Sequence, residues 1–373
     1  MRHISGLKRN HLSVWLFSAT VLFLLVLAGC VISPRRTLGG GGGGGTPTPT
    51  PTTTPTPTAT PTPTPGAPAG KLYVSNSGSN SIVRFDQALS ASGNLAPGAT
   101  ISGAATTLNA PAYIALDAVA DRLFIANNGG LSILIYDNIS TKSGNQAPSR
   151  TIAGANTTLV APTDLSLDAG RDLLYVADDT QVEVFTSAST TSGNIAPARS
   201  LSVSFTIGAI LVDGANDRLF LSDPAGNSIT VYDGASTLAA GPITANRTLS
   251  GAATHLATPA GLQIDGTGRL VVSNAAPGSI TIYANAAGVT GNTAPTAEIV
   301  GSNTGFTTPQ QIVVNTAGTG SAYLADPAAA KIAIYSNLSS QTGNIAPNRI
   351  ISGAATTLTT ASSPGGVALD PTR

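Results

Sequence analysis

The chain has 373 residues, only 10% of which are charged, and its formal net charge at pH 7 is zero. The charges are unevenly distributed, because residues 71–373 hold thirteen Lys and Arg against eighteen Asp and Glu, a net charge of −5. Nucleic-acid binding needs a basic stripe for the phosphates, so this composition argues against a nucleic-acid partner. A single cysteine excludes a disulfide within the chain.

Residues 1–30 predict an export signal. A basic start is followed by an apolar stretch over residues 14–27, which has the length of a signal-peptide core. The stretch ends in L-A-G-C at residues 27–30, which resembles the lipobox of bacterial lipoproteins. In that family the cysteine takes a diacylglycerol before cleavage, so the resemblance implies a lipid on Cys30. An ordinary signal or a plain N-terminal anchor with an incidental cysteine is the alternative.

The residue after the cysteine bears on localisation. In lipoproteins of bacteria with two membranes, an Asp at this position tends to retain the protein at the inner membrane. Here the residue is Val31, so the resemblance implies a lipid anchor in the outer membrane or at the cell surface. Hosts with one or with two membranes both remain open.

Residues 31–70 are predicted to form a tether. Positions 39–45 are an uninterrupted glycine run, a composition typical of flexible linkers. Thr and Pro dominate residues 46–65, which favours extended polyproline II at about 3.1 Å per residue, or roughly 60 Å in all. We therefore expect this segment to hold the following domain clear of a lipid surface.

Residues 71–373 are predicted to be an all-β domain built from repeats. Each unit contains four strand-length apolar runs bounded by Gly, Pro, Asp or Asn. The third run recurs six times, at steps of 51, 51, 45, 51 and 52 residues, at Tyr73, Phe124, Tyr175, Phe220, Val271 and Tyr323. A period near 50 with four strands per unit is typical of propeller blades. The sequence therefore predicts a six-bladed β-propeller with four strands per blade.

The register of the repeat predicts how the ring closes. The repeats open at Lys71 with L-Y-V-S-N and lack the strand that should precede it. A matching strand, G-V-A-L-D, stands at the other end of the chain at residues 366–370. We therefore expect the C-terminal strand to complete the N-terminal blade, which also protects a sheet edge.

Three segments of one blade carry a family resemblance. The sequences P-A-G-L-Q-I-D at 259–265, L-V-V-S-N at 270–274 and I-T-I-Y at 280–283 resemble the NHL repeat. The resemblance extends over residues 71–370. It implies a six-bladed propeller, but such propellers include both passive binding scaffolds and enzymes, so it does not decide the function.

Residues for nucleophilic or acid–base catalysis are scarce. His255 is the only histidine after the predicted cleavage site, and its loop contains no acidic residue. A Ser-His-Asp arrangement would have to use it, and a zinc site built on two histidines is excluded by count. We interpret His255 as a loop residue and expect no catalytic, cofactor-binding or metal-binding residue.

A ring of oxygen-bearing side chains offers an alternative. The third run of each unit ends in Asn or Asp, at Asn76, Asn127, Asp178, Asp223, Asn274 and Asp326. Six such side chains around one axis could bind calcium, as in lactonases that the chain resembles. A residue recurring in every blade also suits a repeated local turn, which is the interpretation we favour. The Asp that ends the second run is interpreted in the same way.

Two further repeated features are predicted to be structural. Arginines precede the outermost run of four units, at Arg150, Arg199, Arg247 and Arg349, and we expect them to pair between blades. The sequence S-G-N or T-G-N, followed by A-P, recurs around five glycines, at Gly93, Gly144, Gly193, Gly291 and Gly343. We interpret these as turns, because Gly and Asn accept positive φ.

One repeat breaks the symmetry. The 45-residue step arises from two short loops, at residues 178–182 and 201–207, which propeller geometry places on one face. Asp178, Asp179 and Asp223 flank the resulting notch and are our candidate ligand-face residues. The alternative is that these loop lengths changed by neutral drift and have no role in binding.

The sequence thus predicts a membrane-anchored extracytoplasmic lipoprotein of the bacterial cell envelope. Its propeller would act as a binding scaffold for a protein or glycan ligand, with the membrane engaged through the lipid on Cys30. A metal-dependent, lactonase- or lyase-like propeller enzyme is the alternative. A structural surface protein without a ligand is a third possibility.

Overall fold

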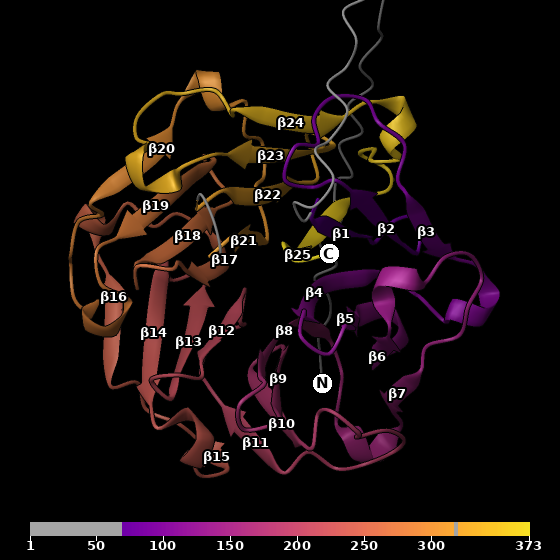
Figure 1. Cartoon of the computed structure of the whole chain (residues 1–373). Coiled ribbons are helices and arrows are strands. Elements are labelled where there is room, and N and C mark those ends of the chain that lie inside the picture. Colours follow the sequence, from indigo (N-terminus) through magenta and orange to yellow (C-terminus); the bar gives the residue numbers. More distant parts are fainter. Residues whose placement is uncertain (1–68, 317–319) are drawn as a thin grey trace, which may run out of the picture. The chain divides into compact units, whose positions relative to one another are not determined.

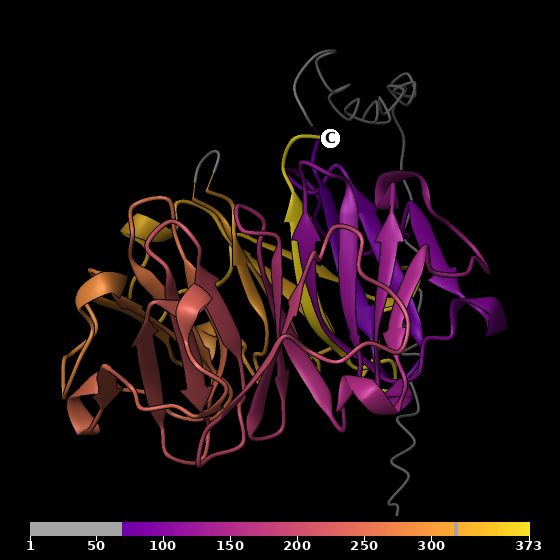
Figure 2. The ribbon, with the colours of Figure 1, turned by 90° about the horizontal axis from the view of Figure 1, so that it is seen from below.

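The computed structural model describes residues 69–316 and 320–373. These residues form six antiparallel sheets arranged radially around one axis, so the predicted six-bladed β-propeller is confirmed (Figure 1). Seen after a quarter turn, the strands run from one end of the ring to the other and the loops gather at both ends (Figure 2). The predicted signal at 1–30 and nearly all of the predicted tether at 31–70 lie outside the described residues.

Each blade contains four strands, named here from the axis outward. Blade 1 comprises β25 (Pro364–Asp370), β1 (Lys71–Asn76), β2 (Ser81–Asp86) and β3 (Ala99–Ser102). Blade 2 comprises β4 (Pro111–Asp117), β5 (Arg122–Asn127), β6 (Ser132–Asp137) and β7 (Arg150–Ala153). Blade 3 comprises β8 (Pro162–Asp168), β9 (Leu173–Asp178), β10 (Gln181–Thr186) and β11 (Arg199–Ser202).

The second half of the ring repeats this order. Blade 4 comprises β12 (Ile210–Asp213), β13 (Arg218–Asp223), β14 (Ser228–Asp233) and β16 (Arg247–Ser250). Blade 5 comprises β17 (Pro259–Ile264), β18 (Leu270–Asn274), β19 (Ser279–Tyr283) and β20 (Ala297–Val300). Blade 6 comprises β21 (Ile312–Val314), β22 (Ala322–Asp326), β23 (Lys331–Tyr335) and β24 (Arg349–Ser352). A short strand, β15 (Gly241–Pro242), adds to the edge of blade 3.

The described helices are single 3₁₀ turns in the connections. They are η1 (Ala104–Thr106), η2 (Asn128–Gly130), η3 (Ile139–Thr141), η4 (Ala155–Thr157), η5 (Ala235–Thr237), η6 (Ala252–Thr254), η7 (Ala286–Gly288), η8 (Ser302–Thr304), η9 (Leu338–Ser340) and η10 (Ala354–Thr356). Across residues 69–316 and 320–373, no helix has the length and apolar character needed to span a membrane.

The core lies between blades. Six clusters of buried apolar side chains each join two neighbouring blades, and one of them joins the first blade to the last. In that cluster Leu72 and Val74 of β1 pack with Tyr323 of β22 and Ile332 of β23. Because both faces of each sheet are covered by a neighbour, the middle strands are almost continuously apolar.

The predicted closure of the ring by the C-terminal strand is confirmed. Strand β25 pairs antiparallel with β1, and Leu369 lies opposite Leu72 while Val367 lies opposite Val74. All seven residues of β25 are buried. The two ends of the propeller are therefore held together by one blade that contains both.

Neighbouring blades are also joined at their outer edges by the repeated Gly-Asn loops. In each of the five joints the glycine forms a parallel bridge to the outermost strand of the preceding blade, as Gly144 does with Ile101. The following asparagine caps that blade's 3₁₀ turn, as Asn145 Oδ1 does with the N–H of Ala105 at 2.7 Å. A side chain at Gly103 would collide with this asparagine. The loops are thus joints between blades as well as turns.

The repeated arginines reach the next blade, as predicted, in three of the four positions. Arg150 donates to the carbonyls of Ala188 and Thr191, each at 3.1 Å, and Arg199 and Arg349 make the equivalent bonds. Arg247 differs, because its partner among the described residues is Asp233 of its own blade, at 2.8 Å.

Candidate functional site

The predicted ligand-face residues lie at one end of the propeller, in blade 3 and beside it. Asp178 ends β9 and is buried, and its carboxylate accepts the backbone N–H groups of Val160 at 2.9 Å and Ala161 at 2.5 Å. Asp179 follows it and is exposed, whereas Asp223 at the end of β13 is half-buried and accepts a backbone N–H of its own turn at 2.8 Å. A ligand at these three residues stays a prediction, and Asp179 is the most accessible of them.

The two short loops of blade 3 meet, as their predicted placement on one face requires. The N–H of Ile207 donates to the carbonyl of Asp179 at 2.8 Å, and that of Val203 donates to Thr180 at 3.0 Å. The Thr206 hydroxyl lies 3.1 Å from the Asp179 carboxylate. Shortening both loops together therefore lets each satisfy the backbone groups of the other.

The ring of Asn and Asp side chains at this end mostly serves local turns. Asn127 accepts the N–H of Asn109 at 2.7 Å, Asn274 that of Ala257 at 3.0 Å, and Asp326 the N–H groups of residues 307 and 308 at 2.8 and 2.9 Å. Each side chain thus caps the loop that leads into its own blade. Within the described residues, no group of three or more His, Cys, Asp or Glu side chains is placed to hold a metal ion.

The Asp residues that end the second run also bind backbone groups. Asp117 accepts the N–H three residues on, at 3.0 Å, and Asp168 does the same at 3.1 Å while pairing with Arg171 at 2.8 Å. Asp265 and Asp370 accept the N–H two residues on, each at 2.9 Å. These carboxylates shape the turns at the opposite end of the ring.

His255 follows η6 in a loop, as predicted, but it has an acidic partner. Its Nδ1 lies 2.8 Å from a carboxylate oxygen of Glu298, which belongs to β20 of the next blade. The loop itself contains no acid, and the carboxylate comes from 43 residues further along the chain. His255 is half-exposed on the outer rim, so this pair is another contact between blades.

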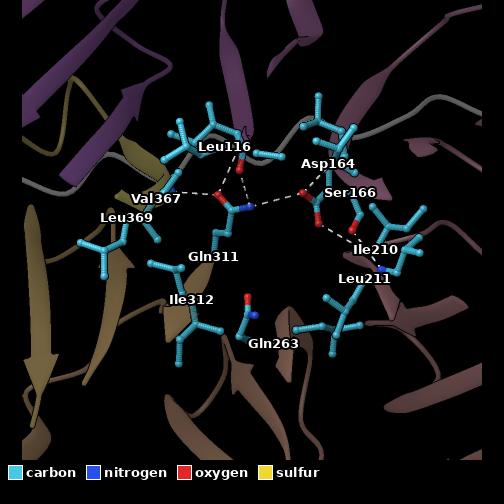
Figure 3. A pocket seen from close by; sticks show the side chains of 18 of the residues that line it. Leu116, Asp164, Ser166, Ile210, Leu211, Gln263, Gln311, Ile312, Val367 and Leu369 are labelled. Atoms are coloured by element: carbon cyan, nitrogen blue, oxygen red, sulfur yellow. Dashed lines mark hydrogen bonds between the residues drawn. The ribbon is translucent and has the colours of Figure 1, made fainter. Parts of the chain in front are cut away.

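A cavity that the sequence analysis did not identify lies on the propeller axis. It has a volume of about 410 Å³ and is lined by the innermost strands of all six blades (Figure 3). Its wall continues past the ends of these strands to Ala118, Ala169 and Thr316. It therefore occupies the half of the channel away from the short loops of blade 3.

Three large side chains close the inner end of this cavity. Gln311, the residue before β21, donates to the Ile114 carbonyl at 3.1 Å and accepts the N–H of Val367 at 2.8 Å. Its amide nitrogen also lies 3.4 Å from the carboxylate of Asp164 on β8. Tyr113 on β4 crosses to β17 and donates to the Ala260 carbonyl at 3.1 Å. These side chains bridge blades 1, 2, 3, 5 and 6.

Asp164 is the buried charge of this floor. Its side chain accepts the N–H of Leu165 at 2.8 Å and that of Ile210 on β12 at 2.9 Å, and the residue is 3% exposed. Burial raises the pKa of Asp164 to about 7, and the two backbone N–H groups only partly oppose that rise. The same burial, together with the nearby Asp164 charge, raises the pKa of Tyr113.

A signal in the repeat marks these residues. They stand third in the P-x-x sequences at the start of the innermost strands of blades 2, 3 and 6. The equivalent residues of the other blades are small, Gly261 and Gly366 after the same proline and Ala209 in blade 4, where the sequence is I-G-A. A side chain at Gly366 would collide with the backbone of residues 112 and 113 on β4, so small residues there leave room for large ones opposite. Large polar residues at three of six equivalent positions were the sequence signal that could have indicated a polar cluster near the axis.

Comparison with known proteins supports the fold alone. No protein-family model and no curated protein matches the chain. A structure of the nidogen/laminin complex aligns with a TM-score of 0.54 at 14% identity, covering 81% of this chain and 98% of that chain. A functionally unknown protein from Desulfotomaculum acetoxidans DSM 771 aligns with a TM-score of 0.52 at 11% identity, covering 80% and 98%.

A third structure is more distant. Hydrazine synthase from Kuenenia stuttgartiensis aligns with a TM-score of 0.44 at 15% identity, covering 62% of this chain. The alignment spans 58% of the hydrazine synthase chain.

Proposed function

We propose that the protein is a lipid-anchored lipoprotein of the bacterial cell envelope whose propeller, built from NHL-like repeats, is a binding scaffold. The L-A-G-C sequence at residues 27–30 supports lipidation of Cys30, and the Pro- and Thr-rich segment that follows would carry the propeller away from the membrane. A propeller displayed on such a tether would present its loops to partners outside the cell membrane.

The observation that carries the scaffold proposal is the coordinated shortening of two loops in blade 3. The loops are bonded to one another through Asp179 and Ile207, so they form one continuous surface rather than two independent ends. This surface presents the exposed Asp179, and the half-buried Asp223 ends β13 at the same end of the ring. We propose that a protein or glycan partner binds there, since binding residues concentrate on loops held by a rigid framework.

Loop grafting tests this proposal. Lengthening the turn after Asp178 and the loop after Leu201 to the lengths found in blade 4 should weaken binding of a partner captured from the cell envelope. The matched control lengthens the equivalent turn of blade 5, between Asn274 and Ser279, by two residues. Unchanged affinity in the blade 3 graft, with the thermal unfolding of both grafts intact, would contradict the proposed binding face.

A further inference from the structure

The axial cavity contains a buried carboxylate without a neighbouring cation. None of the side chains lining it is Lys, Arg or His, while Asp164 lies at its inner end. The hydrogen bonds to Asp164 come from two backbone N–H groups and the Gln311 amide, all of them uncharged donors. A buried carboxylate held only by neutral donors favours a cationic ligand, because charge-assisted hydrogen bonds are the stronger kind.

Other charged and titratable groups leave this carboxylate uncompensated. Tyr113 on β4 lies near enough to Asp164 for the two groups to interact, and Asp117 on β4 adds a second carboxylate to the lining near the mouth. Arg171 and Arg373 lie by the mouth, but each pairs with an aspartate of its own turn, at 2.8 and 2.6 Å. Among the residues that line the cavity, the charged side chains are therefore both carboxylates, those of Asp117 and Asp164.

The cavity also supplies uncharged acceptors and apolar walls. Ser166 lies two residues beyond Asp164 on β8, and its oxygen accepts the Val212 N–H at 3.0 Å with one lone pair, which leaves the second lone pair able to accept from a ligand. The Gln263 carboxamide extends toward the open space from β17 (Figure 3). Leu211 and Val313, both half-buried, belong to the apolar part of the wall.

We propose that the axial cavity binds a small primary ammonium ion that carries a short aliphatic chain. The ammonium group donates to the Asp164 carboxylate, with the oxygens of Ser166 and Gln263 as further acceptors in the lining, and the chain packs against the apolar wall. A volume of about 410 Å³ is within the range of about 300–1,000 Å³ typical of small-molecule sites. The site goes beyond the proposed scaffold function and does not depend on it, because it lies in the channel and not at the short loops.

Binding should depend on pH in a defined direction. The ammonium ion binds the ionised form of Asp164, and burial raises the pKa of this carboxyl to about 7. The ionised fraction is therefore small at pH 6 and large at pH 8. The apparent affinity should be about tenfold weaker at pH 6 than at pH 8, because it scales with the competent fraction.

Calorimetric titration of the full-length chain in detergent micelles tests the site. Butylamine should bind saturably with a stoichiometry near one, and 1-butanol and butyrate, which share its chain, should bind at least about tenfold more weakly. Absence of saturable butylamine binding at pH 8, or equal binding of butanol, would overturn the proposal. Lipidation and partner capture do not enter this measurement, so its failure is separate from failure of the proposed function.

Three variants locate the binding. Asp164→Asn removes the charge and should abolish both butylamine binding and its pH dependence. Ala115→Leu adds bulk to the cavity wall on β4 and leaves Asp164 unchanged, so it should also abolish binding. This variant still tests the site if Asp164→Asn does not fold. Asp326→Asn is the matched control, since Asp326 is another buried carboxylate that accepts two backbone N–H groups, and it should bind butylamine as the wild type does. Retained binding in Ala115→Leu would overturn the axial site.

Discussion

At the level of single residues, burial rather than ion pairing sets the charge of Asp164. The opposite case is Asp233, whose pKa is lowered by its hydrogen bonds with Arg247 and then Arg218. Asp164 faces the closed end of a cavity, whereas Asp233 lies on the exposed rim. Their different surroundings explain why one carboxyl titrates near neutrality and the other remains ionised.

The raised pKa of Asp164 predicts a pH dependence of stability. The folded-state pKa is about 7 against an ordinary value of 3.8, so between these limits the folded protein binds a proton that the unfolded chain releases. Raising the pH from 4 to 7 should therefore lower the free energy of unfolding by about 1 kcal/mol per pH unit through this group. Its contribution becomes constant above about pH 8, where the folded-state carboxyl is ionised.

Urea unfolding of wild type and Asp164→Asn between pH 5 and 8 measures this effect. The difference between their free energies of unfolding should change with pH, because only the wild type has the Asp164 carboxyl. Burial also raises the pKa values of Asp178 and Glu183, but these groups are present in both proteins and cancel in the difference. Asp179→Asn, at an exposed carboxylate, serves as the control. Parallel pH profiles for wild type and Asp164→Asn would contradict the assigned pKa.

The repeated arginines permit a matched comparison. Arg349 donates to the carbonyls of Ala88 and Ala91, at 3.1 and 2.8 Å, and so joins the last blade to the first. Arg349→Leu should lower the free energy of unfolding by about 1.5–3 kcal/mol, because it removes charged hydrogen bonds across the junction. Arg247→Leu should cost less than about 1 kcal/mol, since its partner Asp233 is exposed. Equal losses in denaturant unfolding would show that the inter-blade bonds carry no special weight.

At the level of elements, strand β25 decides whether the ring is closed. It pairs with β1 along most of its length, with one register shift beside Asn76. Val367 and Leu369 pack in the apolar core between blades 1 and 6, and Ala368 packs in the core between blades 1 and 2. It also provides the Val367 N–H that fixes Gln311 across the channel. The C-terminal strand therefore joins the ends of the ring and orders the cavity floor at once.

Deleting residues 366–373 should destabilise the propeller strongly. Loss of Val367 and Leu369 removes about 1.5–3 kcal/mol each, and the exposed edge of β1 adds unpaired backbone groups. Such a loss is large against a typical total stability of about 5–15 kcal/mol. Thermal unfolding should show a much lower midpoint, whereas an equal trim within residues 31–66 should leave the midpoint unchanged. An unchanged midpoint after the C-terminal deletion would show that β25 does not hold the ring together.

At the level of the whole molecule, the propeller combines six similar sheets with one irregular junction. Between blades 3 and 4, the Gly-Asn joint is replaced by β15, whose Gly241 pairs with Leu201 of β11. The short loops lie at the same junction, so its outer edge and one end both differ from the other five. A partner that binds one blade in preference to the others is therefore expected to bind at the junction of blades 3 and 4.

Membrane attachment belongs to the same scale and has its own test. If Cys30 carries the lipid, Cys30→Ser should leave an uncleaved or mislocalised precursor, because the family's processing requires the modified thiol. Labelling cells with radioactive palmitate and fractionating their membranes measures both effects. Undiminished label in the Cys30→Ser protein would rule out lipidation at this residue.

Much of the architecture could be predicted from the repeat itself. The positions of Tyr73 and its five equivalents set the number of blades, and the unpaired strand at residues 366–370 indicated the closure. Both follow from local patterns, since strand-length apolar runs and their spacing are properties of the chain alone. The inter-blade role of the arginines was predicted for the same reason, although Arg247 shows that a repeated residue need not repeat its contact.

The cavity was decided only by the tertiary structure. Tyr113, Asp164 and Gln311 are separated by 51 and 147 residues, and they meet because equivalent positions of a closed ring face one axis. Asp164 is buried there, which raises its pKa, and the glycines at two of the other blades leave room for the large side chains. The sequence determined the repeated sheet and its closure, because these depend on local periodicity. Which side chains share a buried space depends on how six distant strands converge, and no single repeat contains that information.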